Sequence, residues 1–204
     1  ARFLIHVSSS VENSVACDDY TRTKRGQEAL IRASGIPCCI LRPTLMFGWF
    51  DPKHLGWLAR FMEKTPVFPI PGHGRYMRQP LYIRDFCRAL VWAIEHRPAG
   101  AVYDVVGAQR IDYVDMIRLI KKVKGLRTWI VPIPFALFRG LLKVYALFSR
   151  TPPFTADQLE ALAAGDDFQG VETEAAFGFR QTPFEAAIRE SYCHPRYSRV
   201  LVER

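Results

Sequence analysis

Apolar residues along this chain fall into two patterns, short runs and longer stretches with helical spacing. Residues 3–10 begin as a short apolar run and end in three serines, and residues 36–41 form a second short run. Both are typical of strands, and the second is expected to be buried on both faces. Between them, a helix is expected at 21–34, ending at Ser34-Gly35. The order strand, helix, strand indicates an α/β fold with parallel strands.

The same alternation continues to the C-terminus. Asp51 is expected to cap the next helix, and Gly125 is expected to end a later one in a left-handed conformation. The whole pattern predicts the end of a parallel sheet joined to a smaller, mostly helical part. Helices are expected at 53–64, from 85 onward and at 113–124, 134–148, 156–164 and 184–192, and strands at 82–83, 101–106 and 128–131.

The helix that starts near Asp85 shows the spacing most clearly. Its apolar residues recur at intervals of three and four, which places them on one face. We expect that face to be buried against the sheet. The stripe consists of Phe86, Leu90, Ala93 and Ile94.

Composition narrows the class of protein. The chain has 204 residues, of which 49% are hydrophobic, enough for a sizeable core, but no run of about 18 uncharged apolar residues. Its net charge of +8 suits phosphate-bearing ligands or an acidic partner. No recognition motif accompanies that charge, so no nucleic acid is expected. Five cysteines without a C-x-x-C pair indicate a reduced, cytoplasmic setting, and five scattered histidines predict no metal site.

The stretch Tyr20-Thr21-Arg22-Thr23-Lys24 carries the clearest chemistry. Positions i and i+4 of a helix lie on one face, so Tyr20 and Lys24 are expected to point together at the space beyond the first strand. An ammonium beside a phenol favours the phenolate, and such a tyrosine can exchange a proton near neutral pH. A serine from Ser8–Ser10 can hold the substrate oxygen involved. Carbonyl and hydroxyl redox chemistry requires this arrangement, although the Y-x-x-x-K spacing alone also occurs on ordinary exposed helices.

Three segments in order give this pattern a context. The first reads VSSS…YTRTKRGQEALIRASGIPCCILRPTLMFG, and the second is Gly72–Asp85, which fits G-x-G-x-x-x-R-x-x-x-Y-[VI]-x-D. The third runs from Phe177-Gly178-Phe179 to Thr182-Pro183-Phe184. Together they span roughly residues 2–190, and they resemble the extended short-chain dehydrogenase/reductase superfamily, which includes nucleotide-sugar epimerases and dehydratases.

The resemblance implies a fold and a division of the chain. The fold class is α/β, the C-terminal half of a Rossmann-type parallel sheet plus a smaller, mostly helical substrate-binding part. Residues 1–50 would complete the NAD(P)-binding domain, residues 51–194 would bind substrate and interleave with the last Rossmann elements, and 195–204 would form a basic tail. The family's Gly-rich turn, G-x-x-G-x-x-G, is absent from these residues. We therefore expect a missing N-terminal half or a partner chain to complete the sheet.

The resemblance also implies site residues for an NAD- or NADP-dependent reaction on a small carbonyl, hydroxyl or nucleotide-linked substrate. Tyr20 matches the general acid/base and Lys24 the lysine that holds the nicotinamide ribose. Tyr82 and Asp85 are expected to pack and to cap a helix. The other expected contacts are Ser9 as the catalytic serine, Pro43 and Thr44 beside the nicotinamide, and Ser10 and Arg78 at the substrate.

Leu45 departs from the family pattern. The nucleotide-sugar branch carries an asparagine there whose amide contacts substrate phosphate, and leucine cannot make that contact. The departure indicates an alternative, a non-catalytic nucleotide-binding or assembly subunit similar to the accessory subunit of respiratory complex I. The apolar segment 134–148, whose only charges are Arg139 and Lys143, is open to two interpretations: a core helix, or a face for a membrane surface or protein partner.

Overall fold

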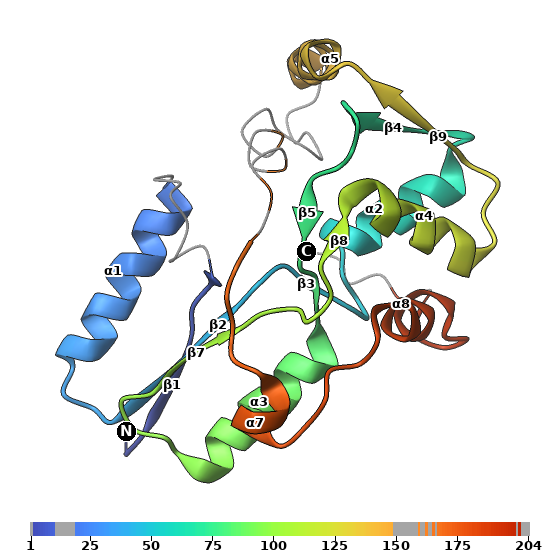
Figure 1. The fold of residues 1–204 in the computed structure, drawn as a ribbon. Coiled ribbons are helices and arrows are strands. Elements are labelled where there is room, and N and C mark those ends of the chain that lie inside the picture. The colour runs from blue at the N-terminus through green and yellow to red at the C-terminus, as the bar shows by residue number, and fades with distance from the viewer. Residues whose placement is uncertain are drawn as a thin grey trace. The chain divides into compact units, whose positions relative to one another are not determined.

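The computed structural model describes residues 2–10, 19–148, 159, 162, 165, 167–198 and 200. Within these residues the chain alternates strands and helices and divides into two compact units (Figure 1). Unit 1 comprises residues 1–47, 79–109 and 168–183, and unit 2 comprises residues 48–78, 110–167 and 184–204. The chain therefore passes repeatedly from one unit to the other. The expected helix at 156–164 lies outside the described residues, apart from Leu159 and Leu162.

Unit 1 is built on a parallel sheet of order β1-β2-β7. The register pairs Leu4 with Cys38 and Ile40 with Val102. A second, two-stranded parallel pairing joins β3 to β6. The elements of this unit are β1 (Leu4–Val7), α1 (Asp19–Ala33), β2 (Cys38–Pro43), β3 (Met46–Phe47), β6 (Leu81–Tyr82), α3 (Ile83–His96), β7 (Val102–Val105) and α7 (Thr173–Phe177).

The two faces of β2 pack against different helices, because successive side chains of a strand point to opposite sides of the sheet. Cys39 and Leu41 pack with the buried residues of α3 and with Phe177 and Phe179 in one apolar cluster. Arg42 points to the other face, where it meets α1. Figure 1 shows α1 on one side of the sheet and α3 with α7 on the other. The sheet is thus covered on both faces, as the apolar run of β2 predicts.

Unit 2 is mostly helical, with two small strand pairs. The pairing of β4 with β9 is parallel, and that of β5 with β8 is antiparallel. Helix α4 packs against α2 and α8 over buried residues that include Met62, Ile117 and Ile188. The elements are α2 (His54–Lys64), β4 (Val67–Pro71), β5 (Met77–Arg78), β8 (Ile111–Asp112), α4 (Tyr113–Lys124), β9 (Trp129–Ile133), α5 (Phe135–Phe148) and α8 (Phe184–Cys193).

Two local expectations were wrong. Ile94 is exposed, and Ala89 takes its place in the buried stripe of α3 with Phe86 and Ala93, because the face turned to the sheet lies a little further round the helix. The N-cap position of α2 is Lys53 rather than Asp51. The Asp51 carboxylate still accepts the backbone N–H groups of Lys53 and Gly56, each at 2.9 Å, so it satisfies the helix start from outside the helix.

Candidate active site

Tyr20 and Lys24 lie one turn apart near the start of α1. The Lys24 ammonium nitrogen is 5.9 Å from the centroid of the Tyr20 ring, and it donates a hydrogen bond of 3.4 Å to the carbonyl oxygen of Val7. Val7 is the last residue of β1, so this contact places Lys24 at the carboxyl end of the sheet. The Tyr20 side chain is 53% exposed, so it is accessible from solvent while one face of its ring meets Lys24.

The serines follow directly after β1. The backbone N–H of Ser8 donates to the Leu41 carbonyl at 2.8 Å, which extends the pairing of β1 with β2 by one residue. Ser10 is buried, and Ser9 between them is half-buried. The three serines therefore begin where the sheet ends, at the same edge as Lys24.

An ion pair in the interior holds α1 to the sheet. Arg42 of β2 donates to both carboxylate oxygens of Glu28, from Nε at 2.8 Å and from Nη2 at 2.7 Å. Burial alone would raise the pKa of the Glu28 carboxyl, but the hydrogen bonds and the charge of Arg42 lower it from 4.5 to about 2. Glu28 lies four residues, about one turn, beyond Lys24, so this pair fixes the helix that carries Tyr20 and Lys24.

His6 belongs to the same face of the sheet. Burial and the nearby Lys24 charge lower its pKa below 6.5, and the Glu28 charge partly offsets them. A neutral imidazole at pH 7 follows. Lys24 therefore faces an uncharged ring rather than a second cation.

Pro43 and Thr44 are buried at the end of β2. The Thr44 hydroxyl donates to the carbonyl of Gln79 at 2.7 Å and accepts the backbone N–H of Gly107 at 3.1 Å. A Cβ on Gly107 would lie 2.3 Å from the Pro80 carbonyl oxygen, so only glycine permits this approach. Thr44 thus joins the ends of β2 and β7 to the segment before β6.

Three further polar residues of unit 1, none of them predicted as site residues, hold distant segments together. Gln79 donates to the Phe168 carbonyl at 3.1 Å and accepts the Phe168 N–H at 2.7 Å. Gln181 bonds in the same way to Val106 and Ala108. Asp85, buried in the first turn of α3, accepts the N–H and the hydroxyl of Thr182 at 2.7 and 3.0 Å. The expected capping role of Asp85 was wrong: the N-cap residue of α3 is Tyr82, without a side-chain cap hydrogen bond, and the Asp85 carboxylate binds a segment far away in sequence.

Arg78 lies on β5 in unit 2, and only 8% of its surface is exposed. Burial raises the pKa of the neighbouring Tyr113, and the positive charge of Arg78 opposes that shift. Arg78 and Tyr113 are therefore two buried polar side chains beside the β5–β8 strand pair.

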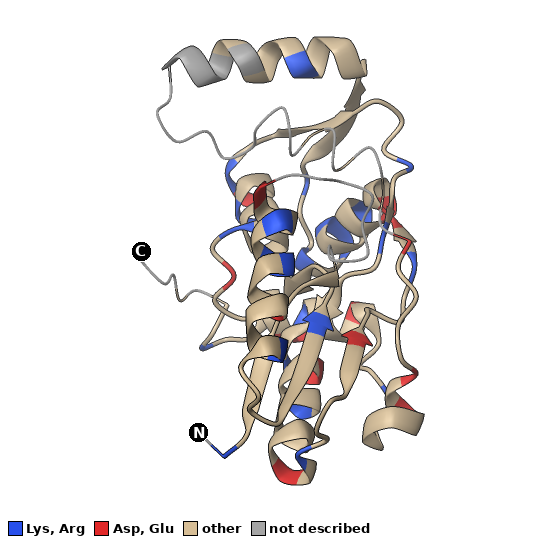
Figure 2. Ribbon diagram, turned by 90° about the vertical axis from the view of Figure 1, so that its left-hand side faces the viewer, with Lys and Arg blue, Asp and Glu red and all other residues tan. Residues whose placement is uncertain are grey.

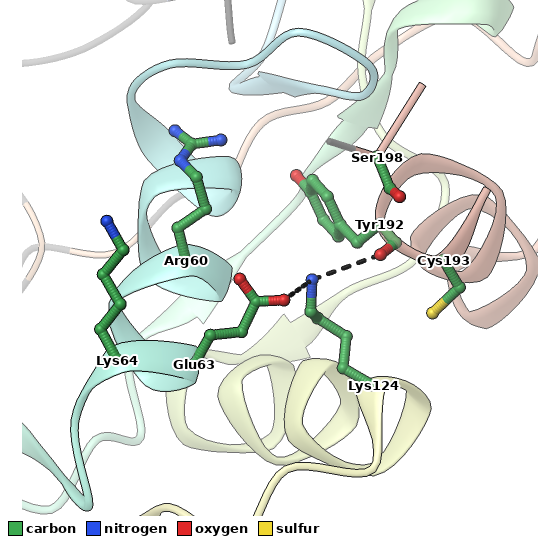
Figure 3. Close-up of a pocket in the computed structure, with 7 residues that line it drawn as sticks. All are labelled: Arg60, Glu63, Lys64, Lys124, Tyr192, Cys193 and Ser198. Atoms are coloured by element: carbon green, nitrogen blue, oxygen red, sulfur yellow. Dashed lines mark hydrogen bonds and ion pairs between the residues drawn. The ribbon is translucent and has the colours of Figure 1, made fainter. Parts of the chain in front are cut away.

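A cavity of about 410 Å³ in unit 2 contains none of the predicted site residues (Figure 3). The last residues of three helices line it: Lys64 of α2, Lys124 of α4 and Cys193 of α8. The Lys124 ammonium forms an ion pair with Glu63 at 2.7 Å and donates to the Tyr192 carbonyl at 3.2 Å. Helix C-termini carry negative partial charge, so the Lys124 ammonium stabilises the arrangement in which three of them lie close together. We interpret this cavity as a structural ion-pair site.

Part of the chain matches the model of a known protein family. Residues 9–106 match the model of the NAD dependent epimerase/dehydratase family. This segment is similar to that family. The match includes Tyr20, Lys24, Pro43, Thr44 and Arg78, and with them residues of the first two motifs, so the resemblance to this family is confirmed. No curated protein sequence matches the chain.

Solved structures of the family have the same fold. The UDP-glucose 4-epimerase of Thermotoga maritima, solved with UDP-glucose, is 16% identical with a TM-score of 0.69, over 94% of this chain and 62% of that one. A mutant dTDP-glucose 4,6-dehydratase of Streptomyces venezuelae with bound NAD is 15% identical with a TM-score of 0.67, over 96% and 61%. The UDP-glucuronic acid 4-epimerase of Bacillus cereus, with UDP-glucuronic acid and NAD, is 20% identical with a TM-score of 0.61, over 94% and 60%. The chain thus spans about three fifths of these relatives.

These comparisons confirm the fold class, the C-terminal half of a Rossmann-type parallel sheet with a smaller, mostly helical part. Among the described residues, no cluster of three or more His, Cys, Asp and Glu side chains could hold a metal ion. In the same part of the chain, no helix combines the length and apolar character needed to cross a membrane.

Proposed function

We propose that this chain supplies the catalytic and substrate-binding part of an NAD(P)-dependent oxidoreductase or epimerase of the extended short-chain type. The observation that carries the proposal is the pairing of Tyr20 with Lys24 at the carboxyl end of β1. In open parallel α/β sheets, ligands bind beyond the carboxyl ends of the strands. The pair therefore lies where a substrate would be expected.

The side chains have distinct roles in this proposal. Tyr20 would give or take the proton of the substrate oxygen, since about half of its side chain is exposed and can meet a ligand. Lys24 would lie beside the phenol and hold the ribose hydroxyls. Ser9 would orient the reacting oxygen. Ser10 and Arg78 would contact the rest of the substrate.

The residues present fit the nicotinamide end of a dinucleotide. Tyr20 and Lys24 lie at the same sheet edge as Pro43 and Thr44, the end of β2. A bound nicotinamide would supply the group that accepts or returns a hydride. The family model and the NAD complexes among the relatives favour NAD, and NADP remains the alternative. The ligands of the relatives also favour a nucleotide-linked substrate. Leu45 argues against one, because its side chain cannot bind a substrate phosphate as the family's asparagine does.

A second candidate is a non-catalytic nucleotide-binding or assembly subunit with the same fold. Leu45 favours it, because its side chain cannot donate a hydrogen bond to a substrate phosphate. In this role, Tyr20 and Lys24 would hold a nucleotide without turning it over.

Substitution of Tyr20 separates the two candidates. In the complete natural protein to which these 204 residues belong, Tyr20→Phe removes the proton-transfer group and keeps the ring. Turnover with NAD or NADP, measured over carbonyl and nucleotide-sugar substrates, should fall by about 10²–10⁴, while cofactor affinity changes little. Lys24→Met should lower both quantities, and Tyr197→Phe in unit 2 serves as the control. Unchanged turnover in Tyr20→Phe, or tight cofactor binding without any turnover in the wild type, would favour the assembly subunit.

A further inference from the structure

Helix α5 is apolar, yet it is not a core helix. None of its described side chains is buried. Leu137, Leu141 and Val144 follow the spacing i, i+4 and i+7, which places them on one face, and they are 55%, 51% and 53% exposed. A helix in a globular protein normally turns such a stripe to the core. The stripe of α5 is therefore open to a partner.

The charge of α5 points to an anionic partner. Its sequence, FALFRGLLKVYALF, contains Arg139 and Lys143 and no acidic residue. In Figure 2 the described part of the α5 ribbon carries the colour of Lys and Arg but not that of Asp and Glu. At 100° per residue, Arg139 falls on the face opposite the leucine stripe, as cationic residues do in helices that lie in a membrane interface. A second copy of α5 would bring no acidic residue to this helix.

The strand pair that leads into α5 is also apolar on one face. Val67 of β4 pairs with Trp129 of β9, and Trp129 and Val131 point to the same side. These side chains are 45%, 74% and 40% exposed. Tryptophan is the residue most typical of the water–lipid boundary, because its ring is apolar and its N–H is polar. Only Pro134 separates β9 from α5, so two successive elements expose apolar residues.

We propose that α5, with the exposed face of the β4–β9 pair, binds the surface of a membrane that contains anionic phospholipid. Fourteen residues of helix extend about 21 Å, which is shorter than the roughly 30 Å of a hydrocarbon core. The helix would therefore lie in the interface, with its leucine stripe among the acyl chains. The net charge of +8 adds a long-range attraction to the same surface.

Vesicle sedimentation tests the proposal with the whole chain. Wild-type protein should sediment with vesicles of phosphatidylcholine and phosphatidylglycerol, and less with phosphatidylcholine alone or at high salt. The double variant L137E/L141E should bind those vesicles on the order of a hundredfold more weakly, since each buried leucine contributes about tenfold. L30E is the matched control, because Leu30 on α1 is also an exposed helical leucine, 73% exposed. R139Q/K143Q should weaken binding severalfold and reduce the preference for anionic lipid.

Circular dichroism and thermal melting establish that each variant is folded, as expected for substitutions at exposed positions. Loss of binding in L137E/L141E but not in L30E supports the proposal. No binding of the wild type to anionic vesicles, or equal binding by L137E/L141E, would overturn it. So would a dimer on gel filtration that L137E/L141E dissociates while wild-type protein ignores vesicles, because the stripe would then cover a second copy.

Discussion

The Glu28–Arg42 ion pair should contribute a large share of the stability of unit 1. We choose Glu28→Gln as the perturbation, because it removes the charge and keeps the shape of the side chain. The Glu28 side chain is 4% exposed and that of Arg42 is 13% exposed, so the variant leaves a guanidinium nearly buried, and the Asp104 carboxylate lies 3.9 Å from it. Removing one partner of a buried pair typically costs about 3–5 kcal/mol.

The pKa of Glu28 gives an independent magnitude. A shift from 4.5 to about 2 corresponds, at about 1.4 kcal/mol for each pH unit, to roughly 3 kcal/mol. Because the pKa is lower in the folded state, this contribution is complete above pH 4.5 and is lost as the pH falls toward 2. The wild type and Glu28→Gln should therefore differ by about 3 kcal/mol at pH 7, and the difference should shrink below pH 4.5.

Urea denaturation at several pH values measures this difference. The matched control is Glu174→Gln, whose carboxylate accepts from Arg180 at 2.6 Å but whose pair is 49% and 84% exposed. We expect the control to change the free energy of unfolding by less than about 1 kcal/mol. The reasoning would be refuted by a Glu28→Gln variant that matches the control at pH 7. A loss that stays constant from pH 7 to pH 2.5 would also refute it.

Two further substitutions test the polar contacts between distant segments. Lys124→Met removes a charged side chain that is 9% exposed and pairs with Glu63, so it should lower the free energy of unfolding by about 1–3 kcal/mol. The control is Lys122→Met on the same helix. Its side chain is 70% exposed, so this variant should change the free energy of unfolding by less than about 0.5 kcal/mol. Asp85→Ala leaves the Thr182 N–H without its acceptor and should cost about 2–3 kcal/mol by urea denaturation; a loss below 1 kcal/mol would mean that this contact does not hold the segment.

Local patterns predicted the helices well, because their signals lie within one segment. Helix α4 was predicted at its observed bounds, and Gly125 ends it with φ of 64° as expected. Strand β4 was not predicted. Pro69 and Pro71 remove two backbone donors from it, and such a segment becomes a strand only through its pairing with β9, about sixty residues later.

In the candidate site, too, local features could be predicted from the sequence and contacts between distant residues could not. Tyr20 and Lys24 share a helix face because of their spacing, and the sequence alone predicts that relation. The contacts of Thr44 with Gln79 and of Asp85 with Thr182 join residues far apart in the chain. No periodicity in the sequence encodes such contacts. A polar residue at a strand end, such as Thr44, can therefore be predicted as a site residue although its hydrogen bonds hold distant segments together.

This division bears on the choice between enzyme and assembly subunit. Asp85, Gln79 and Thr44 each occur in or beside a recognised motif, and each has a structural role that either kind of protein would need. Tyr20 differs from them, because its side chain is half exposed and belongs to no buried cluster. A fold that served only for assembly would not require a tyrosine at that position, one turn before a lysine. The Tyr20–Lys24 pair is therefore the part of the pattern that stability does not explain. It favours a bound nucleotide, and the turnover of Tyr20→Phe decides whether that nucleotide serves catalysis or assembly.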